Sequence, residues 1–359
     1  MFDKSYERYI RQIRVKGFGT ESQNKLYNAK VLVVGAGALG SPVLSYLAAA
    51  GVGTLGVLDS DEVDLTNLQR QVIYTTNDIG QPKAVVASHR LSEMNPEIKI
   101  VTHLVRLHKD NALEIIRNYD LVIDCTDNFP SKFLVNDACV MLNKPCIIGG
   151  VLRFSGQLSV YNYKGGPTFR CLLAEEPDPL EAPSCSEAGV IGMIPGIVGS
   201  MQALEAIKVI TGIGKTLSGR LLNLDGLTMN VDEFEIELNT DNLNITELKE
   251  YEYSCPDSIL KDREIDGQQF LEMISSANPP TVIAFADDET PLNALGQHWY
   301  TIPLYELPNK VPKLPRDSKI LLICEFGLKS QAALRFLVSK HNFDNVLCLK
   351  DGVSHLNLI

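Results

Sequence analysis

Residues 31–40 have the sequence Val31-Leu32-Val33-Val34-Gly35-Ala36-Gly37-Ala38-Leu39-Gly40. Four apolar, mostly β-branched residues predict a buried strand of a parallel sheet, and the apolar residues 41–50 predict a helix after it. In the Gly-x-Gly-x-x-Gly spacing, Gly35 permits a tight turn, Gly37 lets the backbone approach a phosphate and Gly40 lets the helix pack closely on the strand. The stretch therefore predicts a site for a phosphorylated ligand at a helix N-terminus.

Two acidic residues follow the second predicted strand, 55–58. Asp59 comes directly after it, about 20 residues after the glycine pattern, where a carboxylate is placed to bind a ribose hydroxyl. Asp61 lies two residues further on. Taken alone, these features also suit an oxidoreductase that binds a nicotinamide dinucleotide, and this is one alternative.

The rest of the first 240 residues continues the alternation of strands and helices. Strands are predicted at 98–105, 119–124 and 145–148, and helices at 5–29, 83–94, 131–142 and 196–212. Residues 151–163 and 219–237 predict added antiparallel strands. The fold class is therefore α/β, with a doubly wound, mostly parallel Rossmann-like sheet. Ligands of such sheets bind beyond the carboxyl ends of the strands, so Gly40, Asp59 and Asp127 are expected at one edge.

A second, smaller α/β domain is predicted over 263–359, after a polar linker at 241–262. Its central feature is a buried strand, 319–323, that runs into Cys324, a loop with Gly327 and a helix to about 340. The first domain then covers 1–240, and each part is long enough to bury its own core.

Composition narrows the class of protein. The 359 residues carry a formal net charge of -11, which disfavours nonspecific binding to nucleic acid or to an acidic membrane surface. No apolar run reaches transmembrane length and the N-terminus lacks the apolar core of a signal peptide, so we expect a cytoplasmic protein without membrane partners. The eight cysteines form no dense framework, which favours reduced thiols.

Several motifs in order resemble the MoeB/ThiF/HesA family, whose members adenylate ubiquitin-like sulfur-carrier proteins. The resemblance covers about residues 5–235 and rests on Arg11, the glycine pattern, Asp59-x-Asp61, Asn67-Leu68-Gln69-Arg70-Gln71, Gly80-Gln81-Pro82-Lys83 and Asp124-Cys125-Thr126-Asp127-Asn128. It implies ATP as cosubstrate and a carrier that ends in Gly-Gly. The small subunit of molybdopterin synthase is the first candidate carrier and the thiazole-pathway carrier the second.

The resemblance also implies roles for single residues. Asp59 would hold the ribose, and Arg70 and Lys83 the phosphates. Asp127 would carry Mg²⁺, and Asp61, Asn67 and Asn128 belong to the same nucleotide site. Arg11 matches an arginine that reaches the γ-phosphate from a partner subunit, which implies a homodimer. From the residues alone, Arg11 on a solvated helix and a solvated Lys83 are the alternatives, and we expect residues 64–71 to point away from the core.

The second domain resembles a rhodanese, which implies that Cys324 carries sulfur as a persulfide received from a persulfide donor. Glu325 stands where a cation is frequent in such loops, so a docking domain without this activity is the alternative. A non-catalytic scaffold that binds the carrier is the corresponding alternative for the whole chain.

The remaining cysteines concern zinc and the crossover loop. Many relatives hold structural zinc with two Cys-x-x-Cys pairs, but Cys171 and Cys255 keep one cysteine of each, so we predict that zinc is absent. Cys185 matches a crossover-loop cysteine that can attack an activated carboxylate or assist sulfur transfer, and a loop thiol without an essential role is its alternative.

Overall fold

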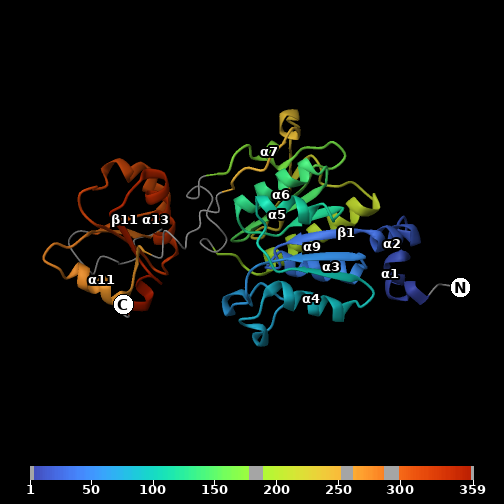
Figure 1. Cartoon of the computed structure of the whole chain (residues 1–359), viewed down its shortest axis with the longest axis horizontal. Coiled ribbons are helices and arrows are strands. Elements are labelled where there is room, and N and C mark those ends of the chain that lie inside the picture. Colours follow the sequence, from blue (N-terminus) through green and yellow to red (C-terminus); the bar gives the residue numbers. More distant parts are fainter. Residues whose placement is uncertain (1–3, 178–188, 252–261, 287–298, 357–359) are drawn as a thin grey trace. The chain divides into compact units, whose positions relative to one another are not determined.

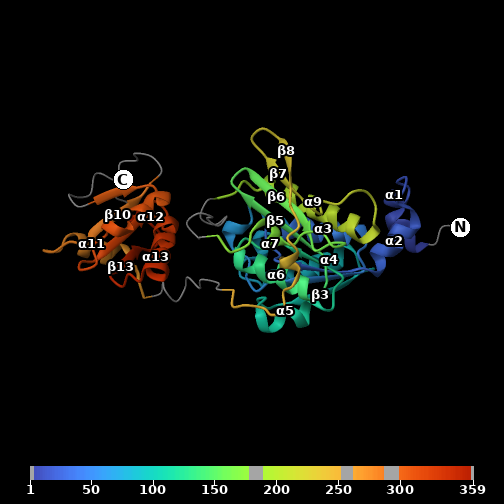
Figure 2. The same cartoon turned by 90° about the horizontal axis from the view of Figure 1, so that it is seen from above.

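The computed structural model describes residues 4–177, 189–251, 262–286 and 299–356 (Figures 1 and 2). These residues fall into two compact units. Residues 4–176 and 189–251 form the first unit, and 262–356 belong to the second. The first unit therefore extends to residue 251, beyond the boundary expected at 240.

The first unit is built on an eight-stranded sheet with the order β3-β2-β1-β4-β5-β6-β7-β8. The strands are β1 (Lys30–Val34), β2 (Thr54–Leu58), β3 (Lys99–His103), β4 (Leu121–Asp124), β5 (Cys146–Leu152), β6 (Ser155–Tyr161), β7 (Arg220–Asp225) and β8 (Asn230–Glu235). The first five pair in parallel and β6 to β8 pair antiparallel. This confirms the predicted doubly wound sheet with added antiparallel strands.

Helices cover both faces of this sheet (Figure 1). They are α1 (Ile10–Ile13), α2 (Gly19–Asn28), α3 (Gly40–Ala50), α4 (Lys83–Met94), α5 (Lys109–Ile116), α6 (Phe129–Met141), α7 (Phe169–Leu172) and α9 (Met193–Thr211). Strand β1 shows why both faces are apolar, because Val31 and Val33 pack into the core with α3, α4 and α9. Leu32 and Val34 point the other way, into the core with α5 and α6.

Helix α9 is long and apolar enough to cross a membrane by length and composition alone. In the structure it packs against α3 and against strands β5 and β6. Its side chains Ile194, Val198, Ala203 and Ala206 are buried in the core on that face of the sheet. Packing inside the first unit thus accounts for its composition.

The N-terminal segment differs from the single helix expected at 5–29. It forms the 3-10 helix η1 (Lys4–Tyr9), then α1 and α2, and the break between α1 and α2 contains Gly17 with φ +89°. The segment is anchored at the C-terminal end of α3. A Cβ on Gly51 would lie 2.6 Å from the Tyr9 ring, and Gln12 donates a 2.9 Å hydrogen bond to the Ala50 carbonyl.

Residues beyond β8 also belong to the first unit. After the 3-10 helix η4 (Thr240–Leu243), Leu248 and Tyr251 pack against the core on the α6 face. The Tyr251 hydroxyl donates a 2.5 Å hydrogen bond to Asp137, which is buried and also paired with Arg170 at 2.6 Å. These contacts explain why the first unit is longer than composition suggests.

The second unit has a five-stranded parallel sheet with the order β11-β10-β12-β13-β9. Its elements are β9 (Glu264–Ile265), α11 (Gly267–Ile274), β10 (Thr281–Phe285), β11 (Trp299–Ile302), η6 (Leu304–Glu306), α12 (Leu307–Lys310), η7 (Val311–Lys313), β12 (Ile320–Cys324), α13 (Leu328–His341), β13 (Val346–Leu349) and η8 (Val353–Leu356). One apolar cluster lies on each face of the sheet. This is the small α/β architecture expected for the C-terminal part.

Candidate active site

The glycine loop lies at the carboxyl ends of β1, β2 and β4, and two of its glycines are required by geometry. The Gly35 amide donates a 2.8 Å hydrogen bond to the Leu58 carbonyl in a turn with φ +94°. A Cβ on Gly35 would lie 2.9 Å from the Cys125 carbonyl oxygen. A Cβ on Gly40 would lie 2.1 Å from the Gly35 carbonyl oxygen, so only glycine lets α3 begin this close to the turn.

The Asp59 side chain hydrogen-bonds the backbone of Ala36 in the middle of the glycine loop. One carboxylate oxygen accepts the Ala36 amide at 2.8 Å and the other accepts the Asp61 amide at 2.8 Å. Burial raises the pKa of the Asp59 carboxyl, although both amides and the nearby Lys83 act in the opposite direction. Each oxygen keeps a further lone pair, so the carboxylate can still accept a hydrogen bond from a ribose hydroxyl.

Tyr74 hydrogen-bonds the other backbone group of Ala36. Its hydroxyl donates a 2.8 Å hydrogen bond to the Ala36 carbonyl, and burial raises the pKa of the phenol well above its usual range. Both backbone groups of Ala36 are therefore fixed by buried side chains. These two hydrogen bonds fix the orientation of the Ala36 peptide groups within the glycine loop.

Lys83 lies in the first turn of α4 and is buried. Its ammonium nitrogen lies 3.1 Å from Oδ2 of the exposed Asp61, and its amide donates to the Asp61 carbonyl at 2.8 Å. The cation at this helix start thus faces an anion rather than bulk solvent. In the structure that anion is a carboxylate of the chain itself.

Arg70 and Asn67 lie on the segment between β2 and α4, at the 3-10 helix η2 (Leu65–Asn67). The Asn67 carboxamide accepts the Asp64 amide at 3.2 Å, which closes the capping box of η2. Arg70 is partly exposed and donates to the Thr66 carbonyl at 2.8 Å. The start of α9 packs closely on this segment, since a Cβ on Gly192 would lie 2.4 Å from the Gln69 carbonyl oxygen.

One residue of this segment contradicts the expectation that it points away from the core. Gln71 is only 5% exposed. Its side chain turns inward to the glycine loop, where its amide nitrogen lies 3.5 Å from the position that a Cβ on Gly37 would take. The residues before it in sequence are mostly polar, and a loop has no hydrophobic periodicity that would indicate which side chains point inward. The burial of Gln71 could therefore not be predicted.

Asp127 and Asn128 follow β4 at the same sheet edge. Asn128 caps α6 by accepting the Ser131 amide at 2.9 Å. Asp127 is exposed, and within the described residues its carboxylate makes no hydrogen bond or ion pair. An exposed oxygen donor of this kind is available to a hard cation.

A buried ion pair that the sequence analysis missed supports the loop that carries Asp127. Lys132 on α6 is buried and donates to Asp124 at 2.8 Å, to the Thr126 carbonyl at 2.8 Å and to the Gly149 carbonyl at 2.7 Å. Gln202 on α9 donates to the Asp124 carbonyl at 2.8 Å. The signal was a lysine within the predicted helix 131–142, which is mostly apolar, because a charge that is buried there must be paired.

Arg11 does not join these residues within one chain. In α1 it lies between Tyr9 and Gln12, and both of these residues contact the C-terminal end of α3. The glycine loop leads into the opposite end of α3, about 16 Å away for a helix of this length. Arg11 is exposed and has no partner among the described residues.

The cysteines of the candidate sulfur chemistry are placed unequally. Cys324 ends β12 and is buried, with its sulfur 3.4 Å from the Ser330 amide and 3.5 Å from the Ser330 hydroxyl. Cys185 and Cys255 lie outside the described residues. The six described cysteines are free thiols, and four of them are buried in the core: Cys125, Cys139, Cys146 and Cys348.

Cys171 lies among neutral hydrogen-bonding groups. Burial alone would raise the pKa of its thiol, but hydrogen bonds with Thr168, Asn239 and Asn242 lower it overall. Within the part of the chain that the structure describes, no three metal-binding side chains gather. The predicted absence of zinc stays a prediction.

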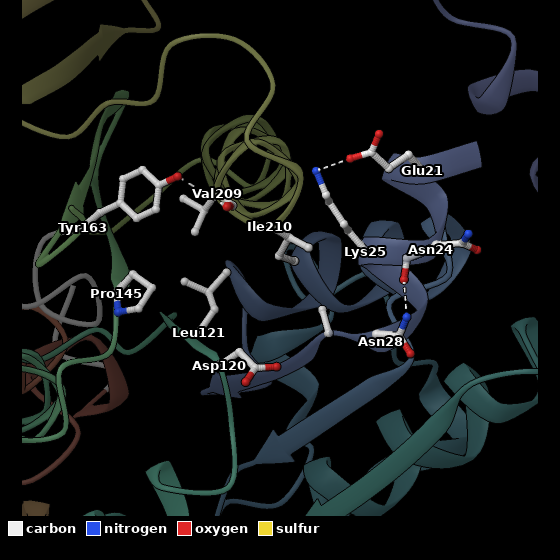
Figure 3. A pocket seen from close by; sticks show the side chains of 11 residues that line it. Glu21, Asn24, Lys25, Asn28, Asp120, Leu121, Pro145, Tyr163, Val209 and Ile210 are labelled. Carbon is white, nitrogen blue, oxygen red and sulfur yellow. Dashed lines mark hydrogen bonds and ion pairs between the residues drawn. The ribbon is translucent and has the colours of Figure 1, made fainter. Parts of the chain in front are cut away.

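A pocket of about 550 Å³ lies away from the glycine loop, between α2, α9 and the amino-terminal edge of the sheet (Figure 3). Its charged groups are already partnered, Lys25 with Glu21 at 2.9 Å and Asp120 with the Lys30 amide at 2.9 Å. Because α/β sheets bind ligands at the carboxyl edge, this pocket is not the nucleotide site.

Comparisons with known proteins agree with the geometry. The model of the ThiF family matches residues 9–245. A sulfur carrier protein adenylyltransferase from Thermus thermophilus is 47% identical, with 69% of this chain and 96% of that protein aligned. A probable adenylyltransferase/sulfurtransferase MoeZ from Mycobacterium tuberculosis is 39% identical over 96% of this chain and 91% of its own length.

Two further comparisons are with a longer relative and with a solved structure. An adenylyltransferase and sulfurtransferase MOCS3 from Aedes aegypti is 46% identical over 69% of this chain, and the alignment spans 58% of that protein. The crystal structure of E. coli MccB superposes with a TM-score of 0.61 at 21% identity, covering 69% of this chain and 75% of that chain, which shows a shared fold. These relatives identify the enzyme class and exclude the nicotinamide alternative. The chain belongs to the ThiF family and is an adenylyltransferase.

Proposed function

We propose that this chain uses ATP to adenylate the C-terminal glycine of a ubiquitin-like sulfur-carrier protein, the small subunit of molybdopterin synthase being the first candidate. The thiazole-pathway carrier is the second. The observation that carries the proposal is the arrangement at the carboxyl edge of the sheet. There the glycine loop, the buried Lys83 and the partly exposed Arg70 are the groups that would bind the phosphates, beside the Asp59 carboxylate.

In this reaction the carrier's terminal carboxylate attacks the α-phosphate of ATP. A bond forms between carboxylate oxygen and phosphorus, the bond to the β-phosphate oxygen breaks, and pyrophosphate leaves. Positioning and charge neutralisation supply most of the rate enhancement. Lys83 and Arg70 are the groups that would neutralise the triphosphate, and Asp59 would orient the ribose.

Magnesium fits this site through Asp127. Mg²⁺ prefers oxygen ligands, retains several waters and is commonly bound by one or two carboxylates together with substrate phosphates. Asp127 offers an exposed carboxylate without a competing partner among the described residues. When bound, the ion would neutralise charge on the leaving pyrophosphate.

Arg11 supports a homodimer in which each subunit completes its partner's site. The argument rests on the placement of α1 at the far end of α3, from which Arg11 does not reach the glycine loop of its own chain. An exposed arginine that has no partner among the described residues is available to a neighbouring subunit's site. The guanidinium would then contact the γ-phosphate.

The second unit is proposed to be a rhodanese-like domain that supplies sulfur. Cys324 lies where β12 ends and α13 is about to begin, with the Ser330 amide directed at its sulfur. A Cys324 persulfide, charged by a persulfide donor, would attack the acyl-adenylate carbonyl through its outer sulfur and release AMP. A second thiol would then attack the Cys324 sulfur, form a disulfide with it and release the carrier's thiocarboxylate. Cys185 is the candidate for that thiol.

The test is ATP–pyrophosphate exchange with Mg²⁺ and each candidate carrier. Exchange that requires one carrier, and disappears when its terminal Gly-Gly is removed, would establish adenylation and name the substrate. No exchange with any carrier, in protein shown to bind ATP, would favour the scaffold alternative.

A cytoplasmic location agrees with the free thiols of the described cysteines.

A further inference from the structure

Gln71 is a buried glutamine whose side-chain carboxamide forms no hydrogen bond with the residues that the structure describes. It is 5% exposed, and its side-chain carbonyl oxygen is sealed from solvent and accepts no hydrogen bond from any described residue. No described residue forms a hydrogen bond with either end of the carboxamide. A buried carbonyl left unpaired is unfavourable, and an apolar side chain of similar shape would avoid the loss.

Other buried glutamines of the described residues behave differently. Gln202 donates to the Asp124 carbonyl at 2.8 Å and accepts from the Cys125 thiol at 3.9 Å. Gln23 donates to the Ala50 carbonyl at 3.1 Å and accepts from Gln12. Both are structural in the ordinary sense, because both ends of each carboxamide are paired. Gln71 is the exception, and it is the one that lies at the glycine loop.

The amide nitrogen of Gln71 lies beside Gly37 of the glycine loop. It lies 3.5 Å from the position of a Cβ on Gly37, the glycine whose missing side chain leaves room there. Its neighbour in sequence is Arg70, and the loop itself is fixed through Ala36 by Asp59 and Tyr74. A neutral donor is thus held, without another use, at the mouth of an anion site.

We propose that Gln71 is a nucleotide-binding residue whose side-chain amide donates a hydrogen bond to a phosphate oxygen of ATP lying over Gly37. This inference rests on the proposed use of ATP at the glycine loop. Leaving the side-chain carbonyl unpaired lowers the stability of the folded chain, but it keeps the amide nitrogen beside Gly37. The hydrogen bond from this amide to the phosphate offsets the lost stability when ATP binds.

The test compares Gln71→Leu with Gln23→Leu in the full chain. Gln71→Leu removes the donor and the unpaired carbonyl together, so the nucleotide-free protein should melt at the same or a higher temperature. Its Kd for ATP should rise about tenfold, as for a lost hydrogen bond to a charged group, while binding of adenosine should not change. Gln23→Leu should lower the melting temperature and leave the Kd for ATP unchanged.

An unchanged Kd for ATP in Gln71→Leu would overturn the inference. An equal loss for adenosine and ATP would also overturn it, because the contact would then be to the nucleoside. If Gln71→Leu does not fold, Gln71→Asn withdraws the donor while keeping the amide, and the same comparison applies. Failure of the proposed function is distinguishable, since it would appear as Gln71-dependent ATP binding without carrier-dependent exchange in the unmodified protein.

Discussion

Lys83 is almost fully buried, yet its ammonium nitrogen pairs at 3.1 Å with Oδ2 of Asp61, whose side chain is 68% exposed. Desolvating a lysine is costly, and an exposed carboxylate is only a partial compensation. The pair is therefore suited to exchange, in which a phosphate oxygen replaces the Asp61 carboxylate at the ammonium group. Asp61 would hold Lys83 in place until the nucleotide arrives.

Lys83→Met should lower carrier-dependent pyrophosphate exchange by about two to three orders of magnitude, as expected for a preorganised charge removed from a transition state. Methionine keeps the volume and removes the charge, so the fold should persist. Lys99→Met, at the exposed start of β3, is the matched control and should retain full activity. Exchange within about threefold of the unmodified rate would remove Lys83 from the phosphate site.

Arg11→Ala should abolish exchange without a change in melting temperature, because the side chain is exposed and makes no contact among the described residues. Dimers that combine two different variants show whether Arg11 acts in its own subunit or in the site of its partner. Arg11→Ala and Lys83→Met are each inactive as homodimers, but a heterodimer of the two would contain one complete site.

Equal amounts of the two variants, co-expressed with different tags, should therefore recover about a quarter of the unmodified activity. Half of the dimers are then mixed and each has one working site of two. No recovery in purified heterodimers would show that Arg11 acts within its own chain or not at all.

The parts of the fold that follow from local sequence were predictable. The run Val31–Val34 and the glycines that follow predict a strand, a turn and a helix, because each choice depends on neighbours in sequence. The antiparallel extension of the sheet and the small second unit were predictable for the same reason.

Other features of the site depend on residues far apart in the chain. The Tyr74 hydroxyl donates to the Ala36 carbonyl, and the Gln202 side chain donates to the Asp124 carbonyl. No period or motif marks these contacts. The polarity of Gln71 suggested the opposite of its burial.

Cys324→Ala should leave pyrophosphate exchange unchanged and remove thiocarboxylate formation when a persulfide donor is present. The two steps separate because Cys324 belongs to the second unit, whereas the nucleotide site belongs to the first. The product can be measured as a mass shift of the carrier.

Cys348→Ala is the matched control for this variant. Cys348 is buried on the neighbouring strand β13, where burial above all raises the pKa of its thiol to about 12, so it stays protonated and unreactive. It should retain thiocarboxylate formation. An unchanged yield in Cys324→Ala would assign sulfur transfer elsewhere and favour a docking role for the second unit.

Asp78 predicts a pH dependence of stability in the segment that leads to Lys83. One carboxylate oxygen accepts the Thr75 amide at 2.6 Å, the Thr75 hydroxyl at 2.8 Å and a guanidinium nitrogen of Arg90. Burial alone would raise the pKa of the Asp78 carboxyl, but the Thr75 hydrogen bonds and the Arg90 charge hold it below its usual range. The native state therefore stabilises the ionised form.

A carboxyl with a lowered native pKa contributes stability above its unfolded pKa of about 3.9, and the contribution is lost as the pH falls through the native value. Asp78→Asn should therefore cost about 1–3 kcal/mol of unfolding free energy at pH 7, and the difference from the unmodified protein should shrink below about pH 4. Urea unfolding followed by circular dichroism measures it. Fluorescence of Trp299, the single tryptophan, reports the second unit separately. Asp232→Asn, on exposed β8, should show no such change, and a pH-independent deficit in Asp78→Asn would contradict the electrostatic origin.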